Sequence, residues 1–441
     1  MKNMKFKFVF FSIALVSQIS MFAQELLTPA EAVSLALENN YGIKLSNTDL
    51  EIAKNNASIL NSGYLPTVTG SAGGTYNRDN TEAEFADGRV TVLNGAESSR
   101  YNAGVDVNYV LFDGLGRSYN YKQLKNSEQL TELQARQTIE NTVLQLFTVY
   151  YNVAELAENF NAISQTFAIS KDRLIRSQYQ FEYGQSTKLV VLNAEVDVNN
   201  DSINVMNSKQ QLRNFKRDLN LVLGNTLVND FNVDTEIQFN TLYNKEELIQ
   251  KALSNNVSLL QADKSIAINK LGINSEKSAY LPTVGLLGSY GWNKNNNNAA
   301  SFVATSTNTG LSGGLNLRWD LFDGGNTITR VKNAKVNLEA QNILKEQLLV
   351  TLQRDFDNAW DNYHNRLQIY RLEEDNIRTS QNNFNRTEEK FKIGQVNSIE
   401  FRLAQVNLLN AELNRNKAKY LAKIAELEML QICGELLNVD F

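Results

Sequence analysis

The chain has 441 residues, a net charge of −5, and only three prolines, one cysteine and one histidine. A single cysteine excludes an internal disulfide, and Cys433 with His364 cannot supply the four ligands of a structural zinc site. The negative charge does not match the basic footprint of nucleic-acid-binding proteins. No phosphate-binding loop or dinucleotide fingerprint follows a predicted strand. We therefore expect no catalytic residue, no metal, no cofactor and no nucleic-acid partner, and predict that the protein is not an enzyme.

The N-terminus has the pattern of a secretory signal peptide over residues 1–23. Lys2, Lys5 and Lys7 precede an apolar run, and small or polar residues follow it up to Ala23. A basic head, an apolar middle and a small residue near the cleavage point define such a peptide. The apolar run is shorter than the ~20 residues of a membrane anchor, and no later run reaches that length, so no transmembrane helix is expected.

The remainder of the chain is an internal duplicate. The motif YLPTV at Tyr64–Val68 recurs at Tyr280–Val284, and LFDG at Leu111–Gly114 recurs at Leu321–Gly324. The second interval is slightly shorter than the first, so the second copy has lost residues between the two motifs. Self-similarity at a nearly fixed spacing indicates a duplicated structural unit. The expected organisation is a first repeat over 24–224, a linker over 225–244 and a second repeat over 245–441.

Each repeat is predicted to begin with one helix, over about 29–61 and 245–277, followed by a β-hairpin within 64–113 or 280–323. From Tyr101 to Leu111 every second residue is apolar, and the intervening residues are mostly polar. This period of two indicates a strand with one apolar and one polar face. The connecting segments, 77–100 and 293–310, are rich in Asn, Ser, Thr and Gly and are predicted to be loops.

The predicted strands are about ten residues long, which is the length that a tilted strand needs to cross a membrane. Four strands cannot close a membrane barrel, because the smallest have about eight. Open edges cannot face lipid, since unpaired backbone groups are costly there. Several chains must therefore pool their strands, unless the sheet belongs to a soluble sandwich, which would need more strands. The polar strand faces carry Asn102, Asp106, Asn108, Asn316, Arg318 and Asp320.

Two very long helices follow the hairpins. No glycine or proline occurs between Gly116 and Gly184, or between Gly325 and Gly394. A helix of that length extends ~100 Å. Each then turns, at 183–186 and 393–396, into a returning antiparallel helix. Apolar residues recur at every seventh position, which predicts coiled-coil seams. The seam positions are Leu146, Val153, Phe160, Phe167, Leu174 and Phe181, then Phe356, Tyr363, Tyr370, Ile377, Phe384 and Phe391, and on the last helix Ile399, Val406, Leu413, Tyr420 and Leu427.

These motifs together resemble the TolC-like outer-membrane efflux protein family, the outer membrane factors. The resemblance rests on both YLPTV motifs, on Trp319–Gly325 and on the two tip segments, and it covers nearly the whole mature chain. It implies an α+β membrane protein: a homotrimer whose twelve-stranded β-barrel, with four strands per chain, continues as a long antiparallel α-helical coiled-coil barrel. The polar strand faces would line the barrel lumen. The location implied is the outer membrane of a diderm bacterium, with the helical part in the periplasm.

The resemblance also implies partners and a pore gate at the tips. The partners are a periplasmic adaptor and an inner-membrane pump or ABC transporter. The gate would involve Glu400, with Arg402 adding a positive charge nearby; Leu403 occupies the next position, which is acidic in some members. The alternative for Glu400 is a solvated helix carboxylate. The residues expected to contact the adaptor are Gly184, Gln185, Ser186, Gly394, Gln395 and Val396.

The function predicted from these features is a passive exit duct for small-molecule efflux across the outer membrane. The same duct serving type I protein secretion is a close alternative. A coiled-coil scaffold without a pore is an alternative of a different class, but it has no use for apolar strand faces of membrane length. Asp113 and Asp323, next to the LFDG motifs, are expected to cap helices rather than to catalyse a reaction.

Overall fold

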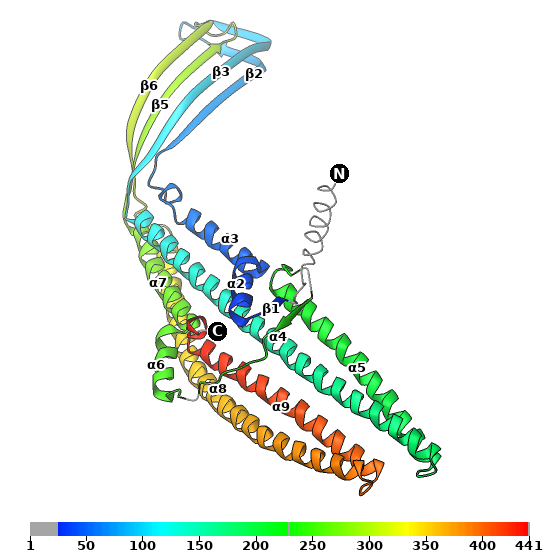
Figure 1. Cartoon of the computed structure of the whole chain (residues 1–441). Helices are drawn as coiled ribbons and strands as arrows, with labels where there is room; N and C mark the ends of the chain where they lie inside the picture. The colour runs from blue at the N-terminus through cyan, green and yellow to red at the C-terminus, as the bar shows by residue number, and fades with distance from the viewer. Residues whose placement is uncertain (1–24, 228–229, 241, 440–441) are drawn as a thin grey trace, which may run out of the picture. The chain divides into compact units, whose positions relative to one another are not determined.

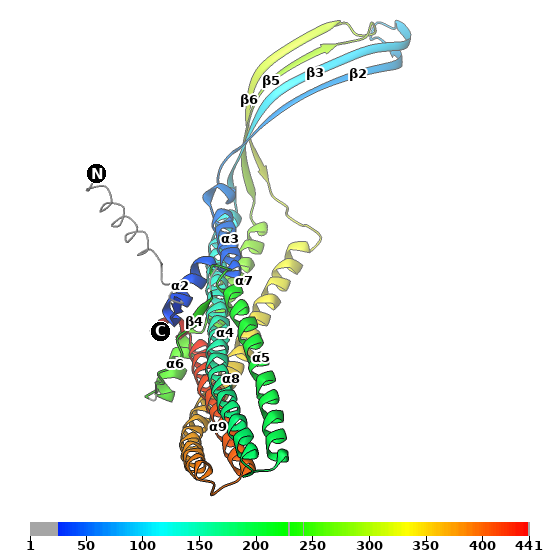
Figure 2. The same cartoon turned by 45° about the vertical axis from the view of Figure 1, so that its right-hand side comes forward.

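The computed structural model describes residues 25–227, 230–240 and 242–439 (Figures 1 and 2), so the predicted signal peptide lies outside the described residues. The chain forms two compact units. The sheet unit comprises Thr48–Gln134 and Leu260–Leu348, and the helical unit comprises Ala135–Leu259 with the two terminal regions, up to Asn47 and from Leu349. In the described part of the chain, no helix combines the length and apolarity needed to cross a membrane.

The sheet unit contains one antiparallel four-stranded sheet in the order β2-β3-β5-β6 (Figure 1). The strands are β2 (Thr67–Glu84), β3 (Val90–Asp113), β5 (Thr283–Asn296) and β6 (Thr305–Arg318). Strands β2 and β6 are the edges, and each pairs on one side only. The prediction of long loops at 77–100 and 293–310 was wrong, because backbone pairing continues through the polar residues and only 85–89 and 297–304 connect the strands.

A bulge near the C-terminal end of β3 changes which side chains share a face of the sheet there. The register of β3 against β5 shifts between Val110 and Phe112, so Phe112, not Leu111, pairs with Val284. An extra residue in one strand of an antiparallel pair re-aims the side chains beyond it. The uninterrupted alternation predicted up to Leu111 therefore ends at the bulge.

The single first helix predicted for each repeat is two helices in the structure. These are α2 (Pro29–Asn39) and α3 (Tyr41–Asn56), followed by the short turn η1 (Ile59–Asn61), and then α6 (Lys245–Asn255) and α7 (Val257–Lys277), followed by η2 (Ser278–Tyr280). The breaks fall at Asn40 and Asn256. The Asn40 side-chain oxygen accepts the N–H of Gly42 at 2.8 Å, and its amide donates to the Val222 carbonyl at 2.8 Å. Such side-chain bonds compete with the helical pattern, which explains the break.

Two long helical hairpins complete the fold. They are α4 (Gly116–Glu182) with α5 (Lys188–Val222), and α8 (Asn326–Lys392) with α9 (Ser398–Ile432), and η3 (Leu436–Asn438) follows them. The members of each pair run antiparallel in both views (Figures 1 and 2). In the helical unit, the core forms around Phe147, Tyr150 and Tyr420. A short parallel pair, β1 (Glu25–Leu27) with β4 (Phe231–Val233), packs against this core.

The predicted coiled-coil seam holds along the middle of the hairpins and at the tip end of α8, where Phe384 and Phe391 are buried, but it fails at the tip ends of α4 and α9. Leu146, Val153 and Phe356 are completely buried. Phe181 and Ile399, in contrast, are 41% and 72% exposed. On α9 the buried residue near the tip is Phe401, which stacks on Phe391 of α8 with ring centroids 4.6 Å apart. The heptad therefore assigns the wrong face in the first turn of α9.

Candidate functional site

The two tips end with the same backbone geometry. Gly184 and Gly394 have φ angles of 72° and 77°, in the left-handed region that glycine adopts without strain. The N–H of Gln185 donates to the carbonyl of Gln180 at 2.7 Å, and that of Gln395 to Lys390 at 2.8 Å. This pattern caps the last helical turn. The predicted contact residues therefore lie in tight turns, with Gln185 and Gln395 exposed and Ser186 and Val396 half-buried.

Glu400 lies in the first turn of α9 and is exposed. The helix begins at an Asn397 cap, whose side-chain oxygen accepts the N–H of Ile399 at 3.0 Å and of Glu400 at 2.9 Å. A carboxylate is favoured there by the positive end of the helix dipole. Glu400 takes part in none of the ion pairs in the described part of the chain, so its charge is available to the solvent at the tip.

Arg402 turns away from Glu400 and binds carboxylates of the first hairpin. Its two terminal nitrogens donate to the two oxygens of Asp201 on α5, at 2.7 and 2.8 Å, and one of them also donates to the Ser170 hydroxyl of α4 at 3.1 Å. Burial disfavours the cation, but the bonds to Asp201 and the charge of Asp197 outweigh burial and raise the pKa of Arg402. The guanidinium therefore joins α9 to α4 and α5 with its charge compensated.

A second arginine completes this polar network. The side chain of Arg173 on α4 is 2% exposed; it pairs with Asp197 and donates to the Ser398 carbonyl at 3.4 Å. Its Nε has no partner in the structure. Sequence reasoning missed Arg173, Asp197 and Asp201. The available signal was that Asp197 and Asp201 lie one turn apart on one face of α5, but their partners come from other helices.

A cavity of about 570 Å³ lies over this network, between the first turns of α5 and α9. Arg173, Asp197 and Arg402 contribute its charged residues. Its walls are mainly aliphatic and include Leu189, Val190, Val196, Ile399, Leu403 and Val406. Leu403, at the position where the resemblance suggested a second acidic residue, is one of these apolar wall residues.

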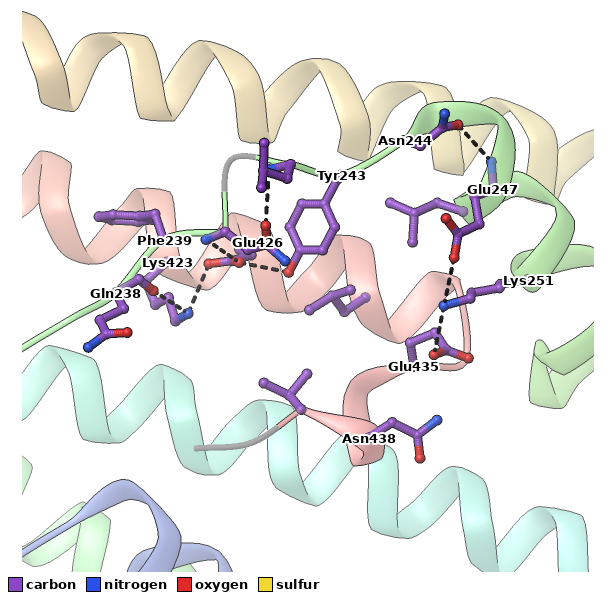
Figure 3. A pocket seen from close by; sticks show the side chains of 15 residues that line it. Gln238, Phe239, Tyr243, Asn244, Glu247, Lys251, Lys423, Glu426, Glu435 and Asn438 are labelled. Carbon is purple, nitrogen blue, oxygen red and sulfur yellow. Dashed lines mark hydrogen bonds and ion pairs between the residues drawn. The ribbon is translucent and has the colours of Figure 1, made fainter.

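A larger cavity, of about 660 Å³, lies between the linker, the start of α6 and the end of α9 (Figure 3). The buried carboxylate of Glu426 accepts the Tyr243 hydroxyl at 2.8 Å and the Lys423 ammonium at 2.9 Å. On the opposite wall, Lys251 bridges Glu247 at 3.2 Å and Glu435 at 3.5 Å. The charged side chains named here are therefore paired with one another across the two walls of the cavity.

The sheet brings most of the predicted lumen residues to one face. Asp106 lies opposite Ser289, which lies opposite Ser312, and these two hydroxyls are 2.8 Å apart. Directly opposed residues on neighbouring strands share a face. The strand pattern puts Asn102, Asn108, Asn316 and Arg318 on that same face. Asp320 lies beyond the end of β6 and pairs with Arg318 at 3.3 Å.

Asp113 and Asp323 act as predicted at the helix starts. A carboxylate oxygen of Asp113 accepts the N–H of Arg117 at 2.9 Å, and one of Asp323 accepts the N–H of Thr327 at 2.8 Å. The bonds to Thr327 lower the pKa of Asp323. These are capping interactions that satisfy free N–H groups in the first helical turn.

The chain matches the family model described as outer membrane efflux protein over residues 32–225 and 248–435. It therefore belongs to that family. It is 23% identical to the outer membrane protein TolC of Vibrio cholerae, covering 93% of this chain and 91% of the relative. It is 19% identical to the outer membrane efflux protein BepC of Brucella suis, with 92% and 85% covered.

The fold is also similar to solved structures of channels. The CmeC outer membrane channel of Campylobacter jejuni aligns with a TM-score of 0.75 at 17% identity, covering 92% of this chain and 86% of that one. The open state of the MtrE outer membrane channel of Neisseria gonorrhoeae aligns with a TM-score of 0.71 at 15% identity, covering 93% and 89%.

Proposed function

We propose that this protein is the outer-membrane exit duct of a tripartite export system, and that it transports small molecules passively. This proposal rests on the sheet. One face of the sheet is strongly polar, the opposite face carries the apolar residues Val105, Tyr290 and Leu311, and the two edge strands lack a partner on their outer side. Family membership and the names of its relatives support efflux and an outer-membrane location.

The open edges favour an assembly of several copies. Backbone groups that face lipid must be paired, so an isolated four-stranded sheet is unsuited to a membrane. Three copies would supply twelve strands, enough to close a barrel, with the helical hairpins continuing it on the periplasmic side. The tip turns at Gly184 and Gly394 would meet a periplasmic adaptor bound to an inner-membrane pump or ABC transporter.

The duct is tested by purifying the protein from membranes in detergent. We expect unheated gels to show a heat-sensitive oligomer, and planar bilayers to show ohmic channels at low voltage. The control is the protein denatured and diluted into the same bilayers. A monomer that remains soluble without detergent and conducts no current would contradict the proposal and favour a scaffold without a pore.

Glu400 is the residue we propose for the cation preference of the tip. Its carboxylate is exposed and unpaired, whereas Arg402 is held by Asp201 and stabilises the tip instead. Rings of like charges around an axis select ions in pores. Glu400→Gln should therefore lower the cation preference, measured as the reversal potential across a salt gradient. Glu389→Gln, at an exposed carboxylate on α8, is the control, and equal reversal potentials for both variants would remove Glu400 from this role.

A further inference from the structure

The polar face of the sheet carries a group of hydrogen-bond donors near the loops that connect its strands. Two neighbouring rows of directly opposed residues lie there, on the same face as Asp106. Opposed residues share a face, and every second residue along a strand returns to it. We call these two rows the outer polar patch. It consists of Thr75, Arg100, Asn295 and Ser306 in one row and Asn102, Asn293 and Asn308 in the other.

Arg100 is the one charged residue of this patch, and its neighbours hold it in place. Its Nε donates to the side-chain oxygen of Asn295 at 3.0 Å, and the Asn295 amide donates to the Ser306 hydroxyl at 3.3 Å. A guanidinium has five N–H groups, and this row uses one of them. The other four have no partner in the described part of the chain. The sheet therefore presents a positioned guanidinium with free donors.

The positive charge of Arg100 is not compensated by a carboxylate beside it. Arg100 takes part in none of the ion pairs among the described residues. Along β2 and β3, the nearest carboxylates on this face are Asp79, two rows further out, and Asp106, three rows further in. At about 3.3 Å per residue these rows are ~13 and ~20 Å away along the strands, beyond the ~10 Å over which salt screens charges. Glu97 lies on the opposite face, with Tyr101.

The chemistry of the outer polar patch matches an oxyanion. The planar N–H groups of an arginine bind carboxylate and phosphate oxygens in pairs. The neighbouring asparagine amides can donate to the remaining oxygens of such a group. A cationic solute would be repelled by Arg100, and the patch offers no apolar side chain to an uncharged one.

We propose that the outer polar patch binds the oxyanion of an anionic solute, a carboxylate, sulfate or phosphate group, with Arg100 as the principal donor. The proposal rests on the proposed function, in which the polar face lines the duct, and it names the class of solute that this wall favours. In a duct of several copies the patch repeats around the axis, and such rings select ions. It lies toward the strand loops, beyond Asp106, so it acts near the exit.

Block of single-channel currents in planar bilayers tests the site, with sodium pyrophosphate as the probe. The protein is added to one compartment, so that its helical part stays there and the strand loops face the other. We expect pyrophosphate to block at lower concentration from the loop side. Arg100→Gln should raise the half-blocking concentration roughly tenfold, which corresponds to one lost hydrogen bond to a charged group. Arg100→Lys keeps the charge but loses the paired donors, and should fall between the two.

Two further variants separate the site from a general effect of charge. Lys294 precedes Asn295 and lies opposite Tyr101, so it is at the same height as Arg100 but on the other face. Lys294→Gln should therefore leave the block unchanged. Asn295→Asp places a carboxylate where the Arg100 Nε donates. It should compensate the guanidinium and weaken the block as much as Arg100→Gln does.

The outcomes distinguish failure of this site from failure of the duct. If the channels conduct but pyrophosphate blocks the unchanged protein and Arg100→Gln equally, or blocks neither, the site is wrong and the duct stands. Equal block of the unchanged protein and Arg100→Lys would show that charge alone is responsible, which contradicts paired donation. A block that depends on Lys294 instead of Arg100 would place the anion on the opposite face and overturn the site. If even the unchanged protein forms no channel, the proposed function fails first.

Discussion

Two charged residues only two positions apart on α9 have opposite environments. Glu400 is exposed in the first turn, while the Arg402 side chain is 19% exposed and fixed by a bidentate bond to Asp201. A helix rotates about 100° per residue, so residues two apart point to different sides. The tip therefore places a free anion toward solvent and a compensated cation toward the first hairpin.

Replacing Arg402 tests whether this network stabilises the tip. Arg402→Met leaves the buried Asp201 without its cation, and breaking a buried ion pair from one side costs about 3–5 kcal/mol. The expected result is a lower urea midpoint for the loss of helical circular dichroism. Asp201→Asn combined with Arg402→Met removes the stranded charge and should recover part of the stability. A double variant no more stable than Arg402→Met would show that the charge of Asp201 is not the cause.

At the level of elements, the duplication is visible in the joints between helices. Asn40 and Asn256 end the first helix of their repeats in the same way, and each donates to a carbonyl near the end of a long helix, Val222 or Ile432. Gly224, two residues beyond Val222, has a φ of 79° and packs against the backbone of Asn39. The joint therefore needs an asparagine and a glycine together.

Gly224→Ala should disrupt this joint. A Cβ at Gly224 would lie 2.5 Å from the Asn39 carbonyl oxygen, closer than van der Waals contact allows. Gly184→Ala is a matched control, because its φ is 72° but nothing lies within 4 Å of the added atom. Both variants carry the cost of a left-handed alanine, about 1–2 kcal/mol. Gly224→Ala should lower the urea midpoint well beyond Gly184→Ala, and equal midpoints would contradict the steric argument.

Sequence reasoning succeeded where the signal is periodic and local, and it failed where a contact comes from elsewhere in the chain. The alternation from Tyr101 and the absence of helix breakers after Gly116 place strand and helix directly. The break at Asn40 depends on the carbonyl of Val222, and the burial of Arg402 depends on Asp201 of another hairpin. A polar loop and a polar strand also have similar compositions, so only the backbone pairing shows that 77–84 continues β2.

At the scale of the whole molecule, a sheet that forms the wall of a duct must contact water on one face and lipid on the other. Asp106 and Val105 are neighbours in β3 that point to opposite faces. Asp106 lies in the row with Ser289, whereas Val105 lies in the row with Tyr290. A charge added on the first face should change conduction, and a charge added on the second should interfere with membrane insertion.

Asp106→Arg and Val105→Arg therefore form a matched pair with different expected defects. Asp106→Arg should insert normally and shift the reversal potential toward anions, because it reverses a charge beside the permeating ions. Val105→Arg would expose a guanidinium to lipid, at a cost of about 2–4 kcal/mol per chain near the bilayer centre. We expect it to reduce the oligomer recovered from membranes while leaving the selectivity of the surviving channels unchanged. The reverse result, with Asp106→Arg blocking insertion and Val105→Arg changing selectivity, would mean that the polar face contacts lipid. It would contradict the assignment of the polar face to the lumen of the duct.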